Sequence, residues 1–250
     1  MNLSARIHHS PSWQLVQSQW LNLTRMPSYS IPTLGFPLMF YAFFGLIMIP
    51  GQSLWLLCTF ATFGILGTAL FAFGVGVASE RAEGWWLLLR CSPAPFCAVL
   101  IGKAFSAMLF AAVVTVSMAW LAALFGDVRL PTVGWAGLVL VMVLGTLPFC
   151  LLGLAFGLIL SPQAAPAVIN IVYLPLGFLS GLWIPVAQFP PALQALAEWL
   201  PPYHLAALAL HVTGTLPGPW LFNVGVLLAY TVIFAAAAGF GWRRLQRASR

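Results

Sequence analysis

Four long stretches of this chain contain no charged side chain. Asp, Glu, Lys and Arg are absent from residues 26–79, 104–126, 130–197 and 199–242. An α-helix needs about 20 apolar residues to cross the hydrocarbon core of a bilayer, so most of these stretches can hold more than one crossing. Only 6% of the residues are charged, against about 25% in a soluble domain. We therefore predict an all-α integral membrane protein.

Proline, glycine and charged residues divide the apolar sequence into six predicted transmembrane helices. Between the fifth and the sixth lies an apolar stretch, 186–213, that prolines interrupt repeatedly. Its pieces are too short to span, so we expect short re-entrant or outer helices there. The expected transmembrane domain covers 31–242, with helices at 31–49, 54–77, 96–125, 133–160, 165–184 and 220–242.

The basic residues indicate the orientation of this domain. With six spans, nine of the ten Lys and Arg residues fall on the side of the N-terminus, and only Arg129 falls on the other. Cytoplasmic segments carry such an excess of Lys and Arg, so we predict that both termini are cytoplasmic. The basic segment 243–250 would then meet anionic lipid headgroups. The net charge of +6 thus reflects topology, and we expect no nucleic acid partner.

The first thirty residues are predicted to form a cytoplasmic tail with one interfacial helix. Trp13, Val16, Trp20 and Leu23 recur at helical spacing, which is typical of a helix lying flat at the membrane surface. No apolar segment with a cleavage site occurs here, so the tail does not resemble a signal peptide. The four cysteines lack metal-ligand spacing, and we expect no metal site.

One segment, residues 79–92, holds two of the four acidic residues of the chain. If it is a helix, then Glu80, Glu83, Leu87 and Arg90 share one face, and Trp85 and Trp86 lie on the other. An apolar residue among charges is typical of a face that docks into a groove of a partner protein. An interfacial loop with ordinary topology charges explains the pattern about equally well.

Two motifs give the chain a resemblance to a known family. The first is Glu80-Arg81-Ala82-Glu83-Gly84, followed by Pro93 and Gly102-Lys103, and the second comes after the fifth predicted span. Together they resemble the signatures of permeases of ATP-binding-cassette type-2 exporters, although Ala82 and Trp85 depart from the usual pattern. The second motif consists of Ser180-Gly181, Pro185, Phe189-Pro190 and Leu200-Pro201.

The resemblance implies a permease subunit in a bacterial plasma membrane that works with a separate ATPase. Segment 79–92 would be its coupling helix. Two ATPase copies would hold ATP and Mg, because this chain has no phosphate-binding loop and no cofactor of its own. We expect a homodimer of permeases with no enzymatic activity. The implied coupling residues are Glu80, Arg81, Glu83, Gly84, Leu87 and Arg90, and the implied outer gate consists of Ser180, Gly181, Pro185, Pro190 and Pro201.

The substrate is expected to be hydrophobic or amphipathic: a lipid, a glycolipid, a drug-like molecule or a peptide. Ionisable residues inside spans usually mark ion pathways, and the four uncharged stretches contain none. Tyr41, Asn170 and Tyr173 are candidate pathway residues, although ordinary hydrogen bonding between helices explains each of them too. Two alternatives stay open, namely an intramembrane Ser-His hydrolase built on Ser180 and a channel or transporter that does not use ATP.

Overall fold

A computed structural model describes residues 35–49, 51–84 and 96–248, which form helices and turns with no strand among them. The prediction of an all-α protein is confirmed for this part of the chain. The predicted interfacial helix in residues 1–30 lies outside the described residues.

In chain order the elements are η1 (Tyr41–Met48), α4 (Ser53–Leu70), η2 (Phe71–Val75), α5 (Gly76–Ala82), α7 (Phe96–Phe125), α8 (Thr132–Leu144), α9 (Thr146–Ile159), α10 (Ala165–Leu179), η3 (Val186–Gln188), α11 (Pro191–Ala197), α12 (Pro201–Val212) and α13 (Trp220–Ala248).

Four helical segments among the described residues are long and apolar enough to cross a membrane. They are Ser53–Ala82, Val99–Phe125, Thr132–Ile159 and Trp220–Leu245. The first and fifth predicted spans correspond instead to two shorter apolar helices, Gly35–Met48 and Ala165–Leu179. The second span is longer than expected, because α4, the π-helix η2 and α5 follow one another without a break.

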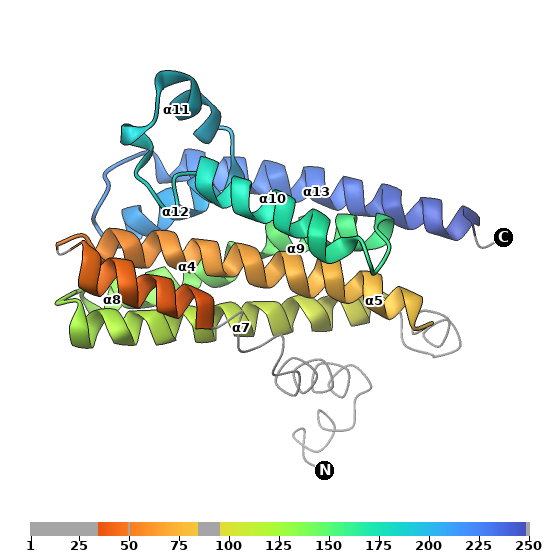
Figure 1. The fold of residues 1–250 in the computed structure, drawn as a ribbon, viewed down its shortest axis with the longest axis horizontal. Helices are drawn as coiled ribbons and strands as arrows, with labels where there is room; N and C mark the ends of the chain where they lie inside the picture. Colours follow the sequence, from red (N-terminus) through yellow and green to blue (C-terminus); the bar gives the residue numbers. More distant parts are fainter. Residues whose placement is uncertain (1–34, 50, 85–95, 249–250) are drawn as a thin grey trace, which may run out of the picture.

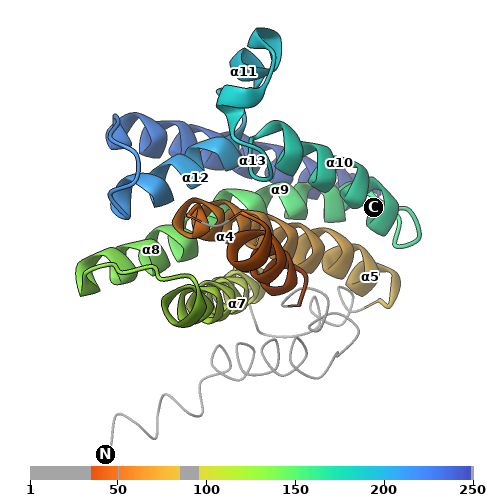
Figure 2. The same ribbon diagram turned by 60° about the vertical axis from the view of Figure 1, so that its left-hand side comes forward.

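Helix α4 lies at the centre of the bundle. Figure 2 shows it between α7 and α8 on one side and α10 and α12 on the other. Its sequence is apolar all round, as expected of a helix that is buried on every side. In the most apolar 18 residues of the second span 89% of the residues are buried, whereas the corresponding share in α13 is 17%. Helix α13 runs along the edge of the bundle (Figure 1).

Glycines let helix α9 approach the second span very closely. A Cβ atom added at Gly153 would lie 3.0 Å from the Ala69 carbonyl oxygen, and one added at Gly157 would lie 2.5 Å from the Phe73 carbonyl oxygen. Small residues four apart are typical of such close helix contacts in membranes. The spacing Gly153-x-x-x-Gly157 therefore forms the seam between α9 and η2.

Helix α12 is inserted into the bundle and does not lie flat on its surface. Its first ten residues are buried except for Tyr203, and it packs against α4, α8 and α13. Leu205 fits against Gly145 at the junction of α8 and α9, where an added Cβ would lie 2.2 Å from the Leu205 Cδ1 atom. Pro148, which cannot donate a helical hydrogen bond, follows this junction and helps to explain the break.

Helix α10 stops at Leu179, five residues before the predicted end of the fifth span. Gly181 has a φ angle of +74°. The amide of Gly181 donates to the Phe178 carbonyl, and the amide of Leu182 donates to the Gly177 carbonyl. This is the Schellman pattern that glycine favours after a helix. The Ser180-Gly181 pair therefore ends the helix.

Candidate functional site

The charged segment that the sequence singles out begins as the last turn of the second span. Helix α5 ends at Ala82, the Glu83 amide donates to the Ser79 carbonyl, and Gly84 has a φ angle of +75°. A right-handed helix does not continue through a left-handed residue. Within the described residues the helix of segment 79–92 therefore ends before Gly84, and the rest of the predicted coupling helix lies outside the described residues. Leu87 and Arg90 lie outside the described residues, and their part in coupling stays a prediction.

Glu80 is turned toward a neighbouring helix and away from the open docking face that the helical spacing predicted. Its Oε1 atom lies 2.5 Å from the Nζ atom of Lys103 on α7. The Lys103 side chain is 7% exposed and that of Glu80 is 26% exposed. A buried ammonium group is costly unless it is paired. Pairing with Lys103 is thus the physical reason why Glu80 faces inward.

Arg81 holds the end of a third helix. Its guanidinium Nη1 donates to the Gly157 carbonyl at 2.8 Å and to the Leu160 carbonyl at 3.4 Å. Both carbonyls belong to the C-terminal end of α9, where the last carbonyls lack partners within the helix. A cation there also interacts favourably with the negative end of the helix dipole. Arg81 therefore links α5 to α9.

Glu83 and Gly84 form the outermost described part of the segment. The Glu83 side chain is exposed, and an added Cβ at Gly84 would meet no atom of the described residues within 4 Å. Of the two acidic residues among the predicted coupling residues, Glu80 is paired with Lys103, whereas Glu83 is exposed and can meet a partner. The Glu83–Gly84 turn is therefore the candidate docking point at this end of the bundle.

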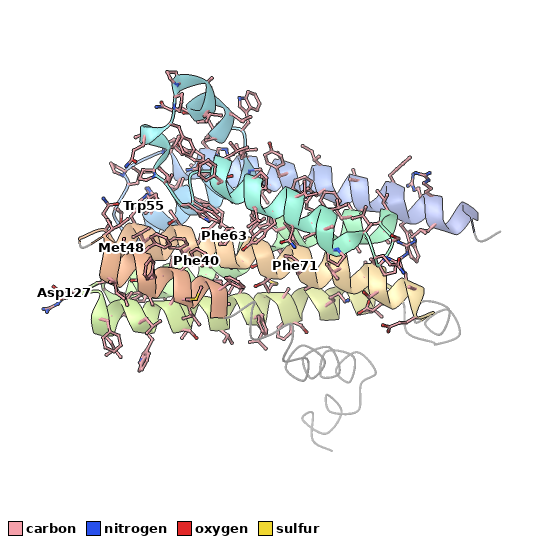
Figure 3. All side chains as sticks on the ribbon, viewed as in Figure 1. Phe40, Met48, Trp55, Phe63, Phe71 and Asp127 are labelled. Carbon is pink, nitrogen blue, oxygen red and sulfur yellow. The ribbon has the colours of Figure 1, made fainter. Side chains whose placement is uncertain are left out.

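The same end of the bundle collects other basic residues. Gly241 on α13 lies against Leu158 near the end of α9, where an added Cβ would lie 3.2 Å from the Leu158 Cβ atom. Arg243 and Arg244 follow directly and are exposed. At the opposite end, Figure 3 shows Asp127 pointing away from the bundle. Its carboxylate accepts a hydrogen bond from the exposed Arg129 at 3.2 Å.

The three candidate pathway residues lie in different environments. Tyr173 donates to the Phe63 carbonyl at 3.3 Å, and its ring stacks on Phe63 at 4.5 Å between centroids, so it helps to hold α10 on α4. Tyr41 in η1 is fully buried, and its hydroxyl has no hydrogen-bond partner among the described residues. Asn170 is exposed on α10. The structure does not gather them into one site.

The prolines of the predicted outer gate start helices. Pro185 precedes η3, Pro190 precedes α11, and Pro201 is the first residue of α12. Pro201 is at the first helical position, which proline favours because its fixed φ suits a first turn and its missing N–H would have no partner there. Ser180 is buried, and its hydroxyl has no partner among the described residues. A gating role for this set stays a prediction.

His204 is held in a network that does not include Ser180. Hydrogen bonds join its Nδ1 atom to Asn223 Oδ1 at 2.7 Å and its Nε2 atom to the Glu198 carbonyl at 2.8 Å. A serine nucleophile needs a base within hydrogen-bond reach, and both ring nitrogens of His204 already have partners. His204 thus joins α12 to α13 and to the end of α11.

Sequence reasoning treated Lys103 as a topology charge and missed its pairing with Glu80. A signal was present, because Lys103 falls inside the predicted span 96–125. An ionisable residue inside a span generally has a partner on a facing helix. Glu80 lies just past the preceding predicted span and could have been proposed as that partner.

Known proteins match the chain along most of its length. The sequence profile described as "ABC-2 type transporter" matches residues 12–213. The chain is also 28% identical over 208 residues to the Bacillus subtilis (strain 168) protein named "Putative transport permease YvfS", an alignment that covers 79% of this chain and 83% of that protein. The chain therefore belongs to the ABC-2 type transporter family.

Proposed function

We propose that the chain is the permease subunit of a bacterial ABC exporter in the plasma membrane, driven by a separate ATPase subunit. The observation that carries this proposal is the end of α5. There the Glu83–Gly84 turn, in which Glu83 is exposed, continues a membrane-crossing helix whose last turn is bonded to α7 and α9. A protein that binds this turn can therefore act on three helices at once. The excess of exposed basic residues at the same end supports a cytoplasmic location.

The proposed assembly contains two permease copies and two ATPase copies. Asn170 supports a second permease copy, because it is an exposed amide on an apolar helix beside the exposed Ile171 and Leu174. A polar side chain in lipid gains from a hydrogen bond to another helix. A second copy of α10 would supply one. ATP and Mg would be held by the ATPase subunits.

The proposed substrate is hydrophobic or amphipathic, such as a lipid, a glycolipid, a drug-like molecule or a peptide. Large apolar side chains are exposed along the bundle, for example Ile171 on α10, Val232 on α13 and Trp120 on α7. A molecule that partitions into lipid can approach these surfaces from within the bilayer. No charged side chain interrupts 130–197, which includes α8, α9 and α10.

Co-purification tests the proposed function. The tagged chain and its variants are expressed in their bacterial host, solubilised in mild detergent and isolated. An ATP-binding protein with a phosphate-binding loop should accompany the wild-type chain in equal amount. Glu83→Lys should reduce its recovery at least about tenfold, because a like-charge contact at an interface costs several kcal/mol and each 1.4 kcal/mol is about tenfold in affinity. Asp127→Lys at the opposite end should leave recovery unchanged. Equal recovery with Glu83→Lys would contradict the docking role, and no ATPase with the wild type would contradict the proposal.

A further inference from the structure

The buried ion pair between Glu80 and Lys103 has a position that stability alone does not explain. Lys103 lies inside the apolar helix α7, seven residues from its start, and it pairs with the last turn of α5. The ammonium group lies beside Gly76, since an added Cβ there would be in ordinary contact with Nζ at 3.6 Å. Replacing such a buried pair by apolar residues is often neutral or stabilising. A pair of this kind is therefore better explained by a need for a specific contact between α5 and α7.

Arg81, the next residue, makes the corresponding contact on another side of α5. Successive residues of an α-helix point about 100° apart, so neighbouring side chains reach different helices. Glu80 reaches α7, whereas Arg81 reaches the Gly157 and Leu160 carbonyls of α9. The end of α5 is thus bonded to two helices immediately before the Glu83–Gly84 turn, in which Glu83 is exposed. We call Glu80, Arg81 and Lys103 the α5 clamp.

The helix changes geometry just before the clamp. The π-helix η2 separates α5 from α4, and α4 is buried from Leu56 to Leu70. Short π-helical turns within longer helices are frequent at functional sites. Here η2 lies between a part of the span that is packed on every side and a part that carries the clamp. A displacement of α5 relative to α4 would therefore be absorbed at η2.

We propose that the α5 clamp transmits movement of the Glu83–Gly84 turn to α7 and α9 together, which makes Arg81 and Lys103 positioning residues of the transport cycle. This proposal rests on the proposed function, because the ATPase supplies the movement. With the clamp intact, α5, α7 and the end of α9 move as one body. Without it, the turn moves while α7 keeps its place. A clamp that only stabilises the fold would lower the yield of protein and leave movement in the assembled complex unchanged.

The test measures movement of α7 in the complex of permease and ATPase. Spin labels are placed on cysteines that replace Phe105 on α7 and Phe240 on α13, both exposed, in a chain whose native cysteines are replaced. Electron–electron distances are measured without nucleotide and after trapping with ADP and vanadate. The set comprises Glu80→Lys, Lys103→Glu, the double charge swap, and Asp127→Arg as the control at the opposite end.

The proposal predicts a trapping-dependent distance change in the wild type and in the control. Each single clamp variant should reduce the shifted population about fivefold or more, even where the ATPase co-purifies in normal amount. The double swap restores opposite charges and should recover the shift. The clamp proposal alone would be overturned if both single variants showed the full distance change on trapping. It would also be overturned if the double charge swap folded and bound the ATPase but showed no distance change. A wild-type chain that binds no ATPase would overturn the proposed function, and the clamp proposal with it.

Discussion

Replacing Gly157 by alanine tests the close packing of α9 on the second span. The new Cβ would lie 2.5 Å from the Phe73 carbonyl oxygen, 2.8 Å from Val77 Cβ and 2.9 Å from the Gly74 carbonyl oxygen. Two of these neighbours are backbone atoms, so a side-chain rotation cannot relieve the clash. Helix α9 must move away from η2, and such overpacking costs about 1–3 kcal/mol. Since Gly157 also accepts the hydrogen bond from Arg81, the same shift would weaken the α5 clamp.

The matched control is Gly239→Ala on α13, where an added Cβ would meet nothing within 4 Å. Replacing glycine by alanine within a helix adds about 1 kcal/mol of helix propensity at either position. The difference in stability between the two variants therefore measures the cost of the clash. Thermal unfolding in detergent, followed by tryptophan fluorescence, measures it. At about 2–4 °C per kcal/mol for a chain of this size, Gly157→Ala should unfold on the order of 5 °C below Gly239→Ala. Equal unfolding midpoints would refute the reasoning from close packing.

Two further substitutions have expected effects on stability, measured by the same unfolding assay. Lys103→Met should destabilise the protein by about 3 kcal/mol, because it leaves Glu80 without its partner. Adding Glu80→Gln to this variant should recover part of the lost stability. An unchanged stability of Lys103→Met would contradict the buried pair. Gly181→Ala should cost about 1–3 kcal/mol from backbone strain and more from a Cβ 2.2 Å from Val186 Cγ2. Gly214→Ala, with the same positive φ but open space, should cost less, and equal losses would argue against the clash.

The positions of the long apolar helices could be predicted from the sequence because charge and proline mark their ends. Among the described residues four of them are long enough to cross a membrane, whereas the first and fifth predicted spans correspond to shorter helices. Helix α4 begins at Ser53, one residue before the predicted start of the second span, and α7 ends at Phe125, the predicted end of the third. The fifth predicted span was too long because the sequence after Leu179 carries no charge and no proline before Pro185. Only the left-handed conformation of Gly181 reveals that the helix ends there.

The side-chain contacts of the candidate site could not be predicted from the sequence. Glu80 and Glu83 lie three residues apart, so helical spacing places them on one face, yet Glu80 is paired with Lys103 whereas Glu83 is exposed. The inward turn of Glu80 depends on Lys103, which is 23 residues away in sequence. The role of Arg81 depends on where α9 ends. Contacts between distant segments of this kind are set by packing, which a local pattern does not encode.

Site-specific photo-crosslinking tests most directly whether an ATPase docks at the end of α5. The photoreactive residue p-benzoylphenylalanine replaces Glu83 or, as the control at the opposite end, the exposed Asp127, and cells that also produce the chain's native partners are irradiated. The account predicts a crosslink from position 83 to a protein that binds ATP and carries a phosphate-binding loop, with none from position 127. A position 83 that crosslinks only to lipid, or to no ATP-binding protein, would contradict it.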